Sequence, residues 1–178
     1  CNNGVPLTYK DYERLVIKPL LSNLDFLKND KVLDVGCGSG IIISKLEEQV
    51  KLIEGIDISQ KLIDFYEGKS TLHCSSVLDF EYKKDYYTKI YMISVSIHFE
   101  NLAYFKAAII KLIDALAPRG TLLIGDQIIG DFYQSEKYFC LMLNDLITVI
   151  NEIGLHFSIK AQEPEFRGRN RYDILIYK

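Results

Sequence analysis

Three glycines and two aspartates in the first third of the chain have the types and spacing that suit the binding of a polar ligand. The stretch 32–40 reads VLDVGCGSG, so an apolar run containing Asp34 leads directly into alternating glycines. Such a turn between a strand and a helix presents backbone N–H groups and places few Cβ atoms in the way of a ligand. Asp57 ends the next apolar run, where an acid can accept both hydroxyl groups of a ribose.

The glycine spacing separates two classes of cofactor. A dinucleotide-binding turn follows the pattern G-x-G-x-x-G, whereas this chain has G-x-G-x-G, with Ile41 where the third spaced glycine would fall. A nicotinamide cofactor, and with it an oxidoreductase, is therefore disfavoured. Ser59 is the expected cap of the following helix, which leaves Asp57 available to a ligand.

The elements that must position these residues alternate along the chain. Strands are expected at 31–35, 52–56, 72–74, 90–95, 121–125, 157–161 and 172–177. Helices are expected at 9–27, from the glycines to about 48, and at 59–66, 102–116 and 135–153. This order predicts an α/β fold, a seven-stranded and mostly parallel sheet with an antiparallel last strand and helices on both faces. The last strand must be antiparallel because its connection is too short for a parallel crossover.

Composition and charge favour one domain over the whole chain, 1–178. Within it, the N-terminal segment 1–28 is expected to be helical and to form part of a substrate lid. The 178 residues are 48% apolar and carry a net charge of -3, with no basic field that would favour nucleic acid or a membrane surface. The longest uncharged apolar run, 90–99, is about half of the roughly 20 residues that a membrane span needs. The four cysteines lie far apart, which favours a reducing cytoplasm and no metal site.

The first glycine motif resembles that of the class I S-adenosylmethionine-dependent methyltransferases, and two further motifs of that family follow in order. The second is similar to GIDIS at 55–59 and the third to LAPRGT at 116–121. The resemblance covers motifs from 32 to 125 and extends to the end of the chain in its strand pattern. It implies a Rossmann-like methyltransferase fold with S-adenosylmethionine as the cofactor.

The resemblance also implies which residues hold the methyl donor. The residues expected to line its methionine part are Gly36, Cys37, Gly38 and Gly40, and Asp34 is expected to help hold its amino group. At the other end, Asp57 would bind the ribose, Ile58 would pack on adenine, and Ser94 and Val95 would flank the sulfonium. The family often has an aspartate that reads the adenine amine where Ser76 stands here, which leaves Val77 as the amide donor.

Fewer residues point to the acceptor. His98 follows the fourth strand, where the family's acceptor often sits, so it is a candidate base; the alternative is a histidine that only packs there. Tyr9 and Tyr12 in the N-terminal segment, and Asp126 beyond the fifth strand, are candidate substrate contacts, with packing and helix capping as their alternatives. Arg167 and Arg169, in the loop before the last strand, suit a phosphate or carboxylate group, unless they form a solvated turn.

These residues favour methyl transfer to an oxygen or nitrogen atom of a small molecule, and an anionic acceptor is a hypothesis that the two arginines suggest. The chain lacks the Asn/Asp-Pro-Pro-Tyr/Phe signature of adenine or glutamine N-methylation and the Pro-Cys of cytosine carbon methylation. Two alternatives stay open: a methyltransferase that acts on RNA or protein, and a partner subunit that binds the donor without catalysis.

Overall fold

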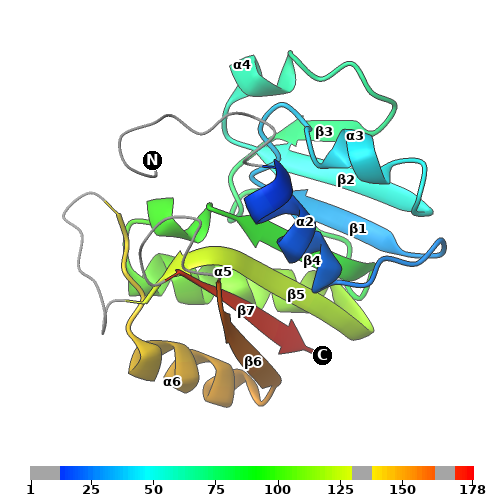
Figure 1. Ribbon diagram of the computed structural model, residues 1–178. Helices are drawn as coiled ribbons and strands as arrows, with labels where there is room; N and C mark the ends of the chain where they lie inside the picture. Colours follow the sequence, from blue (N-terminus) through cyan, green and yellow to red (C-terminus); the bar gives the residue numbers. More distant parts are fainter. Residues whose placement is uncertain (1–12, 130–137, 163–170) are drawn as a thin grey trace.

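The computed structural model describes residues 13–129, 138–162 and 171–178, and its strands form one seven-stranded sheet (Figure 1). In spatial order the strands are β3 (Thr71–Cys74), β2 (Leu52–Asp57), β1 (Lys31–Val35), β4 (Tyr87–Ile93), β5 (Leu116–Ile128), β7 (Arg171–Tyr177) and β6 (His156–Ala161). The pairs from β3 to β5 are parallel, whereas β7 is antiparallel to both β5 and β6. The predicted α/β fold, with its antiparallel last strand, is confirmed.

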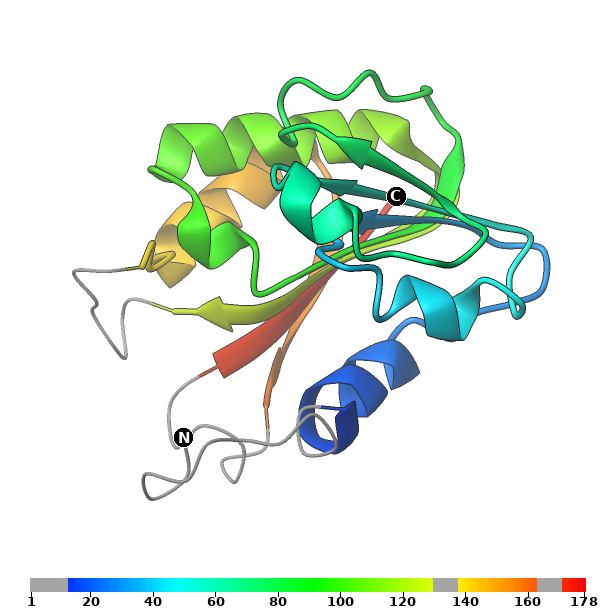
Figure 2. The same cartoon turned by 90° about the horizontal axis from the view of Figure 1, so that it is seen from above.

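Helices cover both faces of the sheet because the strands present apolar side chains on both (Figure 2). Helices α5 (Leu102–Ala115) and α6 (Leu143–Ile153) pack on one face, in a cluster that includes Leu33 of β1. Helices α2 (Lys18–Ser22) and α3 (Ile43–Leu46) lie on the other face, where the neighbouring Val32 is buried. Successive residues of one strand therefore serve two cores, which fixes the strand's register.

Helix α5 shows how local sequence sets an element beside the future site. The Asn101 side chain caps it by accepting a hydrogen bond from Tyr104 N, at 3.0 Å. Phe105, Ile109 and Leu112 recur at helical spacing and are almost fully buried against the sheet. The cap fixes where α5 begins, so the preceding segment is held over the carboxyl end of β4.

Helix α6 begins later than predicted. The expected helix at 135–153 is wrong for 138–142, because backbone groups there bond to other elements instead: Phe139 N donates to Ile97 O and Leu141 N to Ile128 O. Residues 130–137 lie outside the described part of the chain. The predicted end is confirmed, since Gly154 closes α6 in the left-handed region, at φ 73°.

The other expected helices are also shorter than predicted. Helix α3 starts only at Ile43, after Gly40 at φ 71° and in a run of β-branched isoleucines that favours helix weakly. Helix α4 (Gln60–Ile63) is capped by Ser59, as predicted, but stops before 66. In the N-terminal segment a π-helical turn, Glu13–Ile17, precedes α2, and Pro19 lies in the first turn of α2, where a proline is tolerated.

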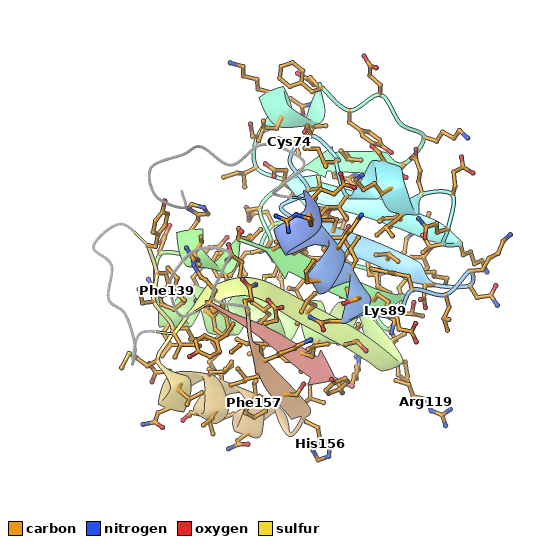
Figure 3. All side chains as sticks on the ribbon, viewed as in Figure 1. Cys74, Lys89, Arg119, Phe139, His156 and Phe157 are labelled. Carbon is orange, nitrogen blue, oxygen red and sulfur yellow. The ribbon has the colours of Figure 1, made fainter. Side chains whose placement is uncertain are left out.

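Two strand limits bear on the site. Strand β4 ends at Ile93, two residues earlier than predicted, because Ser94 takes a left-handed backbone at φ 58°. Strand β5 runs to Ile128, three residues further than predicted. Figure 3 shows Phe139 close to one end of β5 and Arg119, a residue of β5, at the other. Among the described residues, no helix has the length and apolar character needed to cross a membrane.

Candidate functional site

The glycine turn after β1 has the bare backbone that its sequence predicts. Gly36, Gly38 and Gly40 all have positive φ, at 76°, 53° and 71°. Gly36 N and Cys37 N both donate to Ile56 O, at 2.7 and 3.0 Å, which ties the turn to β2. A Cβ atom at Gly36 would lie 2.3 Å from a methyl carbon of Val95, so the turn lies directly against the end of β4.

Asp57 joins the glycine turn to the next helix. One carboxylate oxygen accepts from Gly38 N at 2.9 Å, and the other accepts from Ser59 N at 2.8 Å. The Ser59 hydroxyl in turn accepts from Leu62 N, so Ser59 caps α4 and Asp57 does not. Because each carboxylate oxygen has a second lone pair, Asp57 can organise the turn and still accept a ligand's hydroxyl groups.

A cavity of about 570 Å³ opens between these turns at the carboxyl ends of the strands. This volume lies in the usual range for small-molecule sites, about 300–1,000 Å³. Seven residues predicted from the sequence line it: Gly36, Asp57, Ile58, Val77, Ser94, Val95 and His98. The structure therefore brings together the candidates from β1, β2 and β4 and from the loop after β3.

Five predicted donor residues do not line this cavity among the described residues: Asp34, Cys37, Gly38, Gly40 and Ser76. Gly38 lies just behind its wall through the bond to Asp57. The Ser76 hydroxyl donates to the Asp79 carboxylate at 2.5 Å, which stabilises the turn after β3. The direct donor contacts expected of these five residues stay predictions.

Asp34 and Cys37 are buried in the core beside the turn. The Tyr91 hydroxyl donates to Asp34 at 3.0 Å. Burial, with a smaller contribution from the Asp57 charge, raises the pKa of Asp34 from 3.8 to about 7, although the Tyr91 hydrogen bond opposes this shift. Burial and the charges of Asp34 and Asp57 raise the pKa of the Cys37 thiol to about 12. At neutral pH the Cys37 thiol is therefore protonated and uncharged.

His98 stands at the rim of the cavity. It ends the short 3-10 helix Ser96–His98, its side chain is exposed, and its ring meets Tyr138 edge to face, with centroids 5.6 Å apart. This position leaves the imidazole accessible both to a bound acceptor and to water. The proton-transfer role of His98 stays a prediction, and its ring contact with Tyr138 is the packing that the sequence offered as the alternative.

Asp126 lies deeper than a substrate contact at the surface would. It is fully buried, and the Ser94 hydroxyl donates to its carboxylate at 2.5 Å. Its other carboxylate oxygen faces Arg171 Nε at 3.6 Å. Its neighbour Gln127 is equally buried and bonds to the Ser96 hydroxyl. Tyr9, Tyr12, Arg167 and Arg169 lie outside the described residues.

Sequence reasoning missed several residues that line the cavity: Leu62, Ser75, Ile93, Phe99, Glu100 and Tyr104. Phe99, Glu100 and Tyr104 come from the segment that enters α5. The available signal was Asn101, a cap residue just before an apolar helical repeat, which marks the start of a helix after β4. Glu100 adds a second carboxylate, in addition to that of Asp57, to the cavity lining.

The chain matches the family model of a methyltransferase domain over residues 9–142. A stretch of 60 residues is 32% identical to an uncharacterized methyltransferase of Schizosaccharomyces pombe and covers 30% of this chain and 23% of that protein. A stretch of 105 residues is 28% identical to part of a probable non-canonical nonribosomal peptide synthetase of Salinispora arenicola. This alignment covers 54% of this chain and 1% of that protein. The chain thus spans less than a quarter of either curated relative.

Solved structures with the same fold cover nearly the whole chain. A SAM-dependent methyltransferase from Methanosarcina mazei superposes with a TM-score of 0.72 at 15% identity, covering 90% of this chain and 97% of that one. Magnesium protoporphyrin IX methyltransferase from Synechocystis, solved with bound SAM, superposes with a TM-score of 0.71 at 16% identity. This superposition covers 98% of this chain and 86% of that one. The chain belongs to the methyltransferase domain family and has the Rossmann-like fold of the S-adenosylmethionine-dependent class I methyltransferases.

Proposed function

We propose that this domain binds S-adenosylmethionine in the cavity at the carboxyl ends of β1, β2 and β4 and transfers its methyl group to an oxygen or nitrogen atom of a small molecule. One observation carries the proposal: in a chain of this family, Asp57 is hydrogen-bonded to the glycine turn and lines a cavity of about 570 Å³. The Synechocystis methyltransferase with this fold acts on a small molecule, which supports an acceptor of that kind.

The residues of the cavity fit such a donor. Gly36 lines the cavity and has Val95 packed so closely on it that no Cβ atom would fit, and Asp57 offers carboxylate oxygens for a ribose. Ile58 and Leu62 are exposed apolar side chains at the cavity wall, where an adenine ring would cover them. Asp34, which is buried behind the turn, would act on the donor's amino group only through the turn or after a shift of its side chain.

The chemistry asked of this chain is modest. When bound, S-adenosylmethionine supplies a methyl group that is already activated, so the protein has to align the acceptor and exclude water. Ser94 and Val95 would hold the wall next to the reacting carbon, and His98 at the rim would take the proton that the acceptor loses. The 1–28 segment, with Tyr9 and Tyr12, is proposed as part of the lid over the acceptor.

The donor site can be tested by titrating S-adenosylhomocysteine into the protein by calorimetry, with NADH as the comparison ligand. Asp57→Ala should weaken binding by roughly 1–3 kcal/mol, because the ribose hydroxyls lose a charged partner and the glycine turn loses its anchor. Asp64→Ala is the matched control, since it removes an exposed acid at the far end of α4, the helix that follows Asp57. A parent chain that binds NADH but not S-adenosylhomocysteine would overturn the proposal.

An anionic acceptor is the finer part of the proposal, and it rests on Arg167 and Arg169 in the loop before β7. Guanidinium groups pair well with phosphate and carboxylate, so Arg169→Glu should weaken the binding of acidic acceptors. The readout is the KM for phosphate- and carboxylate-bearing acceptors, compared with the unchanged affinity for S-adenosylhomocysteine. Equal acceptor affinity in the variant and the parent would count against an anionic acceptor.

A further inference from the structure

Two residues beside the cavity adopt a backbone conformation that normally favours glycine. Ser94, after β4, has φ 58°, and Asp126, in β5, has φ 62°. A non-glycine residue adopts this conformation only where surrounding contacts impose it, and such residues tend to cluster at functional sites. The two are directly linked, because the Ser94 hydroxyl donates to the Asp126 carboxylate at 2.5 Å.

The two partners differ in what they reach. Ser94 lines the cavity, whereas Asp126 is fully buried behind it. Asp126 therefore has no direct contact with a ligand in this cavity, and its hydrogen bond to Ser94 links it to the cavity wall.

Asp126 is itself held firmly from the antiparallel end of the sheet. Its backbone N–H donates to Asp173 at 3.2 Å, and its backbone oxygen accepts from Arg171 at 3.0 Å. Arg171 Nε also lies 3.6 Å from the other carboxylate oxygen, Oδ1. The pairing of β5 with β7 shifts register between Ile124 and Gln127, so Asp126 sits in an irregularity that these contacts stabilise.

Ser94 in turn sets the position of a tight contact. The next residue, Val95, packs on Gly36 so closely that no Cβ atom would fit there. Ser94 N also donates to Gly125 O at 3.0 Å, which holds the end of β4 against β5. A change in the Ser94 backbone would therefore move the wall of the cavity against the glycine turn.

We propose that Asp126 is a positioning residue, which holds Ser94 in its left-handed conformation and so shapes the donor side of the cavity from behind. The inference rests on the proposed function, because it says how that same site is kept in a binding-competent form. The sequence made Asp126 a candidate for direct contact with substrate. In this proposal Asp126 acts indirectly, through the Ser94 hydroxyl.

Two substitutions of Ser94 separate this role from direct contact with a ligand. Ser94→Ala and Ser94→Gly both remove the hydroxyl, but only glycine adopts φ 58° without a steric cost. We expect Ser94→Ala to weaken S-adenosylhomocysteine binding at least tenfold more than Ser94→Gly does. Equal losses in the two variants would show that the hydroxyl itself contacts the ligand, and would overturn the inference.

Asp126→Ala tests the other partner of the pair. It should weaken binding at least tenfold in the parent, but by less than about threefold when added to Ser94→Gly, because the tether is no longer needed. Ser96→Ala is the matched control, since the Ser96 hydroxyl bonds to Gln127 in the same way but Ser96 does not line the cavity. If Asp126→Ala fails to fold, the two Ser94 variants decide the matter alone.

Hydrogen exchange at the Ser94 amide gives a readout without any ligand. Asp126→Ala should speed this exchange at least tenfold, because the Ser94 N–H leaves Gly125 O when the turn relaxes, and Ser96→Ala should not. An unchanged exchange rate in Asp126→Ala would overturn the positioning role even if the donor binds. A parent chain that binds no S-adenosylhomocysteine would instead refute the proposed function, whatever the exchange rate shows.

Discussion

The turns after β1 and after β4 border the same cavity, but different residues make them possible. After β1 the left-handed positions are Gly36, Gly38 and Gly40, which adopt positive φ at little cost. After β4 and in β5 they are Ser94 and Asp126, which do so only while a hydrogen bond and an ion pair hold them. One side of the site is therefore shaped by backbone freedom and the other by side-chain contacts.

This difference predicts how each side responds to substitution. At the glycine turn, an added Cβ atom does more harm where less space is available, whereas near Ser94 the loss of a single hydrogen bond is enough. The glycine side should be intolerant of larger residues but insensitive to remote changes. The serine side should respond to changes in β5 and β7, which never reach the cavity.

The largest effect is expected for Gly36→Ala. The new Cβ atom would stand 2.3 Å from a Val95 methyl carbon, on a backbone at φ 76°. Strain and overpacking together should lower the free energy of unfolding by about 2–5 kcal/mol. Displacement of Val95 should weaken S-adenosylhomocysteine binding at least a hundredfold. Chemical denaturation and calorimetry measure the two losses separately.

Gly38→Ala is the matched control for this change. Gly38 also has positive φ, at 53°, but the atom nearest to a Cβ there is a Leu62 methyl carbon at 4.0 Å. Only the backbone cost applies, roughly 1–2 kcal/mol. If Gly38→Ala and Gly36→Ala lost binding equally, the close approach of Val95 would not be what makes the glycine side intolerant.

The sequence predicted the glycine side well because its physical requirement leaves a visible signature. The alternating glycines after an apolar run predicted the turn, and they have the positive φ that such a turn needs. Asp57 ends β2, and Ser59 caps α4 as expected. The strand pattern and the antiparallel end of the sheet were likewise predictable, since alternation and connection length determine them.

The other side left no such signature. A serine or aspartate with positive φ looks like any other in the sequence, so neither the pair Ser94–Asp126 nor its support from Arg171 was predicted. Helix limits failed for a related reason: at 138–142, bonds to Ile97 and Ile128 outcompeted the local helical tendency. Tertiary contacts decided these features, and a single sequence does not display them.

The comparison extends to the buried aspartates behind the two sides. Asp126 faces the Arg171 guanidinium, whereas the carboxylate of Asp34 faces the Tyr91 hydroxyl and feels the charge of Asp57. Burial raises the pKa of Asp34 from 3.8 to about 7. An acid with a higher pKa in the folded chain loses stability as pH rises between its unfolded and folded pKa values, here from about 4 to about 7.

Asp34→Asn should therefore change how stability depends on pH. The variant should gain on the parent by roughly 2–3 kcal/mol in unfolding free energy between pH 5 and pH 8, because only the parent must ionise a buried acid. Tyr91→Phe should extend the parent's loss to higher pH, since it removes the hydrogen bond that favours the ionised form. Denaturation curves across this range check both. Parallel pH profiles for Asp34→Asn and the parent would mean that burial does not raise the pKa of Asp34 in the folded chain.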